Sequence, residues 1–143
     1  MKIVVSACLL GENCKYNGGN NYCQKVVDLV KGREVIRVCP EVLAGMPVPR
    51  VPIEIKDGIV VDRDGNVVDA VIREAVAKTL LQLKDEDIEY AVLKARSPTC
   101  GVHRIYDGTF TGGKVAGNGV TVDLFLKNGI PVFTEAELDQ LPL

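Results

Sequence analysis

The sequence has no tryptophan and only one histidine among its 143 residues. The missing tryptophan leaves few side chains on which nucleic-acid bases can stack, and one histidine cannot build a histidine-rich metal site. No apolar run approaches the roughly 18–20 residues needed to cross a bilayer. Residues 1–7 are too short for the apolar core of a signal peptide and are typical of a strand. We therefore expect a cytoplasmic protein without membrane contact.

The sequence also lacks a large excess of positive or negative charge, since its formal net charge is −2. Residues 1–50 carry seven basic and four acidic groups, whereas residues 51–143 carry ten and fifteen. Affinity for a phosphate backbone requires clustered lysine and arginine, and neither segment has a large basic excess. The charge balance favours a small-molecule substrate over nucleic acid.

Repeats and low-complexity tracts are absent, and 47% apolar with 25% charged residues is an ordinary globular composition. A chain of this length suits one domain, which we place at 1–143. Apolar runs and helical periodicity predict alternating strands and helices. In chain order these are strand 2–7, helix 22–31, strand 34–38, helix 69–83, strand 90–95, helix 120–128 and strand 131–133.

This alternation predicts an α/β fold with a single doubly wound, mostly parallel sheet that is Rossmann-like and has strand order 2-1-3-4. A β-hairpin is inserted around Asp57-Gly58 and joins strands at 51–56 and 59–62. Residues 134–137 have the spacing of a capping box and predict a short terminal helix. The glycine-rich stretch 106–119 is expected to be a flexible loop.

Five cysteines are the most informative residues, since a fully disulfide-bonded secreted protein would use an even number. Cys8 directly follows the first predicted strand, Cys39 ends the second, and Cys100 lies five residues past the third. Parallel strands place their carboxyl ends at one edge of the sheet, where α/β proteins bind ligands. We therefore expect these three thiols to converge, although a single buried cysteine would be explained by core packing.

Three thiols suit several metals. Zinc takes four protein ligands, or three and a water, and iron–sulfur clusters are commonly held by four thiolates. A [4Fe-4S] cluster on three thiolates leaves one iron open. No CxxC pair occurs, which counts against zinc ribbons and thioredoxin-like chemistry. Cys14 lies in a polar turn six residues after Cys8 and is an alternate ligand, whereas Cys23 in a predicted helix is assigned a structural place.

Polar residues are expected around the same edge. Glu41, two residues after Cys39, is a candidate general base once partly desolvated, with an ordinary helix-end or loop-end carboxylate as the alternative. Ser97 is a candidate for orienting a substrate, although serine before proline is also ordinary turn chemistry. His103, the single histidine, is expected on the surface.

Separated motifs resemble those of one known family in the same order along the chain. They are SACLLG at 6–11, CKYNGG at 14–19, CPE at 39–41 with GMPVPR at 45–50, and KARSPTCG at 94–101 with YDGTF at 106–110. The family is that of the thiouracil desulfidases, iron–sulfur-dependent enzymes that act on thiolated pyrimidines. The resemblance spans nearly the whole chain, and none of these motif positions departs from the family pattern.

This resemblance implies a [4Fe-4S] cluster held by three cysteines, with the substrate sulfur bound to the fourth iron. We assign the ligands to Cys8, Cys39 and Cys100, with Cys14 as the alternate. Glu41 and Ser97 match the motif positions implicated in catalysis. The implied reaction is non-redox desulfidation of a substrate of the 2-thiouracil or 4-thiouridine type, with release of sulfide. Such a cluster can be lost from an aerobically prepared sample.

Two other hypotheses remain open. A non-catalytic iron–sulfur or metal-binding module would use the same thiols and give Glu41 no role. A thiol-based redox protein would use Cys8 and Cys14 and would work without iron. Among substrates, the charge balance favours a free thiolated base or nucleoside over thiolated tRNA. A small basic group is nevertheless expected near the site: Lys15, Arg50, Lys94, Arg96 and Arg104.

Overall fold

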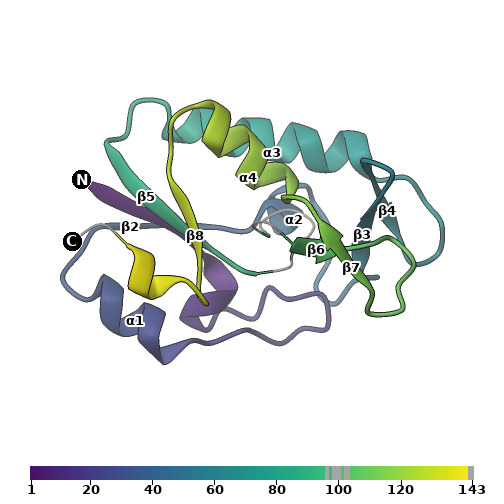
Figure 1. The fold of residues 1–143 in the computed structure, drawn as a ribbon, viewed down its shortest axis with the longest axis horizontal. Helices are drawn as coiled ribbons and strands as arrows, with labels where there is room; N and C mark the ends of the chain where they lie inside the picture. The colour runs from purple at the N-terminus through teal and green to yellow at the C-terminus, as the bar shows by residue number, and fades with distance from the viewer. Residues whose placement is uncertain (96, 98–100, 102–103, 142–143) are drawn as a thin grey trace.

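A four-stranded parallel sheet lies at the centre of the computed structural model, which describes residues 1–95, 97, 101 and 104–141 (Figure 1). Its strand order is β2-β1-β5-β8, and each neighbouring pair is parallel. The predicted α/β class and the predicted order 2-1-3-4 are therefore confirmed. The strands are β1 (Lys2–Ser6), β2 (Val35–Val38), β5 (Ile88–Leu93) and β8 (Val132–Thr134).

Helices cover both faces of this sheet, because successive side chains of a strand point to opposite faces. Val4 and Leu93 belong to the apolar cluster that includes residues of α3 and α4, whereas Ile3 and Val5 belong to the one that includes α1. Figure 1 shows α3 and α4 on one side of the sheet and α1 on the other. The helical elements are η1 (Ala7–Leu10), α1 (Gln24–Val30), α2 (Pro40–Leu43), α3 (Asp69–Leu83), α4 (Val120–Lys127) and η2 (Leu138–Gln140).

The inserted hairpin forms where Asp57-Gly58 predicts it, between β3 (Ile53–Lys56) and β4 (Ile59–Asp62). Asp57 and Gly58 have φ angles of 51° and 80°, as a type I′ turn requires at both central positions. The hairpin buries Ile53 and Val60 against Ile72 of α3. It is therefore attached to the sheet through the long helix.

A second hairpin replaces the flexible loop expected at 106–119. β6 (Arg104–Tyr106) pairs antiparallel with β7 (Lys114–Ala116). Glycine-rich composition indicated flexibility, but Asp107 N–H donates to the carbonyl of Gly113 and helps to close the turn. Figure 1 shows this hairpin beside β3 and β4, at the end of the molecule away from the chain termini.

Two short elements have no counterpart in the prediction. η1 is a single 3-10 turn after β1, and α2 is a one-turn helix with Pro40 in its first turn. Both are shorter than the window over which helical periodicity can be read. The terminal helix forms only as the 3-10 turn η2, although Glu137 does accept a hydrogen bond from the N–H of Thr134. Among the described residues, no helix is both long and apolar enough to span a bilayer.

Phe125 of α4 is fully buried against the central sheet, so Phe125→Ala is expected to lower the free energy of unfolding by about 3–5 kcal/mol. The neighbouring Leu126 is 47% exposed, and Leu126→Ala is expected to cost no more than about 0.5 kcal/mol. Urea unfolding followed by circular dichroism measures both variants. Equal losses in the two variants would contradict this placement of the helix.

Candidate active site at the carboxyl edge of the sheet

A cavity of about 370 Å³ opens where the strands of the sheet end. Ser6 and Val38, the last residues of β1 and β2, line it, as does Lys94 directly after β5. The opposite wall includes Glu54 of β3 and Phe110 after β6. This is the position at which open α/β sheets bind ligands, and the volume suits a small molecule.

Two of the predicted ligand cysteines lie in this cavity. Cys8 is in η1 directly after β1, and Cys39 precedes α2 directly after β2. Ser6 and Val38 are paired across the two parallel strands, so the segments that follow them emerge side by side. Cys100, the third predicted ligand, lies outside the described residues, as do Arg96 and His103.

Cys14 lies in the same cavity, on the loop between η1 and α1. Its thiol interacts electrostatically with Cys8 and is within hydrogen-bonding reach of Cys39. Cys23 precedes α1 and packs, like Cys8, against the apolar cluster that contains Ile3 and Val5, but it is not among the residues that line the cavity. Among the described cysteines, the cavity thus brings together Cys8, Cys14 and Cys39.

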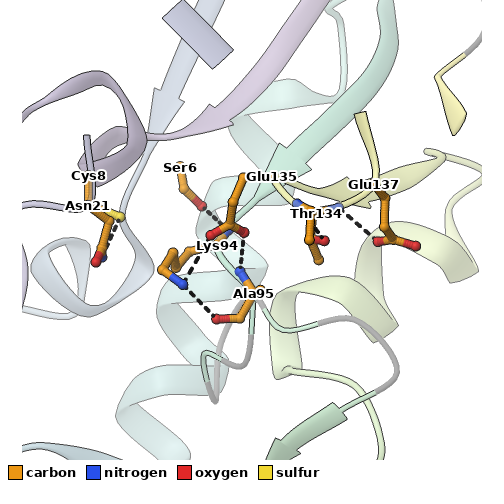
Figure 2. A network of polar contacts seen from close by, with 9 residues as sticks. Ser6, Cys8, Asn21, Lys94, Ala95, Thr134, Glu135 and Glu137 are labelled. Atoms are coloured by element: carbon orange, nitrogen blue, oxygen red, sulfur yellow. Dashed lines mark hydrogen bonds and ion pairs between the residues drawn. The ribbon is translucent and has the colours of Figure 1, made fainter. Parts of the chain in front are cut away.

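The environment opposes ionisation of Cys8 and Cys14. Burial raises the pKa of Cys8, although a hydrogen bond from Asn21 Nδ2 to its Sγ, 3.4 Å long, partly counters this (Figure 2). Burial also raises the pKa of Cys14 to about 12, and negative charge on Cys39 and Cys8 raises it further. Thiolates gathered here therefore repel one another, and a bound cation or cationic cluster would relieve that repulsion.

The donor set suits an iron–sulfur cluster. Within residues 1–95, 97, 101 and 104–141, no three His, Cys, Asp or Glu side chains are arranged to hold one metal ion. A cluster binds each thiolate through a different iron, so its thiolates stand farther apart than the ligands of one ion. Sulfur is the donor that iron–sulfur clusters prefer, and the cavity supplies several sulfurs.

Glu41 faces the cavity from the first turn of α2 and is held by a buried arginine. Arg50 Nη2 donates to Glu41 Oε2 at 2.6 Å, and the two side chains are only 4% and 17% exposed. Arg50 also donates to the backbone carbonyls of Cys14 and Pro47. The sequence contains both residues in its motifs, but no periodicity or spacing relates them, and their pairing emerges only in three dimensions.

A polar network holds the end of β5, where the chain enters the segment that carries Ser97 (Figure 2). Glu135 Oε1 accepts a hydrogen bond from the N–H of Ala95, and its Oε2 lies 3.0 Å from Lys94 Nζ. Ser6 Oγ accepts a hydrogen bond from the N–H of Lys94. Ser97 itself lines the cavity. The sequence analysis did not identify Glu135 as a site residue. Glu135 follows β8, and only the folded structure shows its contacts with the residues that follow β5.

Only some of the basic residues expected near the site line the cavity. Lys15, Arg50 and Lys94 line the cavity, whereas Arg104 is an exposed residue of β6. Arg63 also lines the cavity, so two of the four cations among the described lining residues form ion pairs, Arg50 with Glu41 and Lys94 with Glu135. About half of the positive charge at the cavity is therefore balanced by neighbouring carboxylates.

The site is thus a thiol-rich cavity at the carboxyl edge of a parallel α/β sheet, with a carboxylate and a serine in its wall. Residues 3–137 match the model of the 2-thiouracil desulfurase family. The chain is 38% identical over 149 residues to the uncharacterised protein YbbK of Bacillus subtilis (strain 168), with 97% of this chain and 99% of that protein covered.

The structure is also similar to that of the [4Fe-4S]-dependent thiouracil desulfidase TudS, with a TM-score of 0.90 and 39% identity. That similarity covers 98% of this chain and 94% of the other. The chain belongs to the 2-thiouracil desulfurase family, and the resemblance noted in its motifs is confirmed.

The raised pKa of Cys14 predicts slow, strongly pH-dependent alkylation in the metal-free protein. The pKa of Cys14 is about 12, which is four pH units above pH 8. At pH 8 only about 10⁻⁴ of the molecules therefore carry the Cys14 thiolate, the form that reacts. The iodoacetamide rate at Cys14, followed by peptide mass spectrometry, should rise about tenfold per pH unit through pH 10. An unstructured peptide with one cysteine is the reference, since its rate levels off above its thiol pKa of about 8.5. A similar plateau at Cys14 would contradict this assignment.

Proposed function

We propose that this protein removes sulfur from a thiolated pyrimidine of the 2-thiouracil or 4-thiouridine type, in a non-redox reaction that uses a [4Fe-4S] cluster. The observation that carries the proposal is the gathering of cysteine thiols in one cavity with Glu41. Membership of the 2-thiouracil desulfurase family and similarity to TudS support it. The net reaction exchanges the thiocarbonyl sulfur for the oxygen of water and releases hydrogen sulfide.

Cys8, Cys39 and Cys100 are the proposed cluster ligands, with Cys14 as the alternate. The first two meet because β1 and β2 are parallel neighbours, and Cys100 follows the segment that leaves β5. When bound, the cluster would supply a Lewis-acidic iron that polarises the thiocarbonyl group of the substrate. The raised pKa of Cys8 is consistent with a thiol that becomes a thiolate only when such a centre binds.

Glu41 is the proposed general base, which takes a proton from the water that attacks the thiocarbonyl carbon. Its Oε2 is engaged by Arg50, so the carboxylate is held in one orientation at the cavity wall. Ser97 lines the same cavity, and its hydroxyl is proposed to donate a hydrogen bond to the substrate or to the developing negative charge. The carbon–sulfur bond then breaks while the proton on Glu41 and the remaining proton of the added water pass to the sulfur, so that a carbonyl forms and hydrogen sulfide leaves.

A small substrate fits the site better than thiolated tRNA does. The cavity has the volume of a small-molecule site, at about 370 Å³. Arg50 and Lys94 are paired with Glu41 and Glu135, which leaves less positive charge for phosphates. We therefore propose a free thiolated base or nucleoside as the substrate.

Anaerobic reconstitution should load about four iron and four sulfide per chain. Cys8→Ala, Cys39→Ala and Cys100→Ala are each expected to abolish the visible charge-transfer absorption, because each removes one thiolate ligand. Cys23→Ala is the matched control and should retain it, since Cys23 does not line the cavity. If Cys14→Ala loses the cluster and Cys100→Ala retains it, the third ligand is Cys14 and not Cys100. Full zinc occupancy without iron uptake would refute the cluster proposal.

The loaded wild-type protein should release sulfide from 2-thiouracil or 4-thiouridine. Glu41→Gln removes the base but keeps an oxygen that can accept from Arg50, so the cluster absorption should persist. Sulfide release should fall at least about 100-fold, the lower end of what carboxylate proton transfer contributes. Glu74→Gln, on the exposed face of α3, is the control and should be as active as the wild type. A loaded wild type without turnover would instead indicate a non-catalytic iron–sulfur module.

A further inference from the structure

Aromatic side chains gather at the cavity, and the proposed function gives none of them a role. The chain has four tyrosines and three phenylalanines. Tyr16, Tyr106 and Phe110 line the cavity. By contrast, Phe125 lies in the core and Tyr90 packs edge-to-face against Phe133. A protein with so few aromatic residues therefore places a large share of them around one small volume.

Phe110 has a backbone conformation that its side chain disfavours. Its φ angle is 59°, in the left-handed region that glycine and asparagine adopt readily and bulky residues rarely do. Such conformations persist only where the surroundings impose them, and they are concentrated at ligand sites. Phe110 is half-buried and lines the cavity, so this strained backbone carries a large apolar ring to the site.

Glu54 of β3 imposes that conformation from the neighbouring hairpin. Its side chain is buried, and its Oε1 accepts hydrogen bonds from the N–H of Gly108 at 3.0 Å and of Phe110 at 3.2 Å. Gly108 approaches β3 so closely that an added Cβ would lie 2.6 Å from Lys56 Cβ. Two backbone donors and one close approach thus fix the YDGTF motif against β3.

Within the motif, Asp107 completes the turn that leads to Phe110. Its Oδ1 accepts hydrogen bonds from the N–H of Thr109 at 2.9 Å and from Thr109 Oγ1 at 2.6 Å. Side-chain-to-backbone bonds of this kind stabilise a turn locally. The polar residues of the motif therefore build the turn, and its two aromatic members, Tyr106 and Phe110, both line the cavity.

Phe110 is distinguished from the two cavity tyrosines by what lies over their rings. Lys15 Nζ is 5.8 Å from the ring centroid of Tyr16, and Lys114 Nζ is 5.7 Å from that of Tyr106. Each tyrosine thus has one ring face engaged by an ammonium group. Tyr16 is also 40% exposed. Among the described residues no such contact involves Phe110, so its ring is the better candidate for a flat apolar partner.

We propose that Phe110 is a substrate-binding residue that stacks on the planar ring of the thiolated pyrimidine, and that Glu54 is its positioning residue. This inference rests on the proposed function and names the recognition element of the same site. A pyrimidine presents π-faces to which an aromatic ring binds without regard to the atoms at its edge. The cysteines and Glu41 would then act at the substrate's edge while Phe110 holds its face.

Phe110→Gly in the cluster-loaded protein tests the stacking role. Glycine adopts the left-handed conformation without strain, so the turn is kept while the ring is removed. The KM for 2-thiouracil is expected to rise about 5- to 150-fold, the range that corresponds to loss of one stacked base. The Kd of uracil, measured by calorimetry, should rise by a similar factor, and kcat should change less. The melting temperature should stay within about 3 °C of the wild type.

Two variants serve as matched controls. Phe110→Tyr keeps the ring and should retain a KM within about twofold of the wild type. Tyr16→Ala removes a cavity ring whose face is engaged by Lys15, and it should raise KM less than Phe110→Gly does. A ring with only a structural role would give a large drop in melting temperature with unchanged KM and uracil affinity, and would overturn the inference.

Glu54 is tested through its coupling to Phe110. Glu54→Leu removes both hydrogen bonds and should raise KM, whereas Glu54→Gln keeps one acceptor oxygen and should raise it less. If Glu54 acts by placing Phe110, Glu54→Leu added to Phe110→Gly should change KM little beyond Phe110→Gly alone. If the single Glu54→Leu variant fails to fold, the comparison is made with Glu54→Gln. Additive effects would overturn the positioning role.

The two levels of the proposal fail differently. A wild-type protein that releases sulfide and binds uracil, with both constants unchanged in Phe110→Gly, overturns the stacking role and leaves the proposed function intact. A loaded wild-type protein that neither turns over 2-thiouracil or 4-thiouridine nor binds uracil overturns the proposed function and the stacking role together.

Discussion

Parallel pairing of β1 with β2 on one side and β5 on the other is the constraint on which the site depends. Parallel strands must be joined by crossovers, so their carboxyl ends meet at one edge although they are far apart in the sequence. Ser6, Val38 and Leu93 end these strands. The segments that follow carry Cys8, Cys39 and Ser97 to a common cavity. One topological rule thus assembles side chains from three parts of the chain.

Paired charges then hold the emerging segments in place. Arg50 joins α2, through Glu41, to the loop that carries Cys14, and Glu135 joins the ends of β5 and β8 through Lys94 and Ala95. A buried charge loses its hydration, so it is tolerated only with a partner. Separating either ion pair would leave a poorly hydrated charge without its partner, which costs free energy. The Arg50–Glu41 pair therefore holds the Glu41 carboxylate in a fixed position at the cavity.

The cavity has two walls of different chemistry. The edge of the parallel sheet supplies thiols and a carboxylate, whereas the β3–β4 and β6–β7 hairpins supply Glu54 and aromatic rings. The hairpins are attached through α3 and through the hydrogen bonds of Glu54 rather than by extending the sheet. The thiols and Glu41 therefore lie on different supporting elements from Glu54 and Phe110.

The parallel sheet, its strand order and the first hairpin could be predicted from the sequence, because these features depend on local signals. Apolar runs mark buried strands, Asp57-Gly58 supplies the positive φ angles of a type I′ turn, and alternation implies crossovers. The predicted ends of the strands were also enough to predict that Cys8 and Cys39 lie together. The neighbourhood of Cys100 stays a prediction, since that residue lies outside the described part of the chain.

Only the tertiary structure decided which polar groups meet. Asn21 donates to Cys8, Arg50 pairs with Glu41, and Glu54 binds the turn that carries Phe110. Hydrophobic periodicity indicates which face of its own helix or strand a residue occupies. It carries no information about the residue from another element that this residue contacts. The glycine-rich stretch shows the same limit, since composition indicated a loop whereas pairing of β6 with β7 made a hairpin. Those pairings depend on distances that exist only after the sheet and its helices have packed.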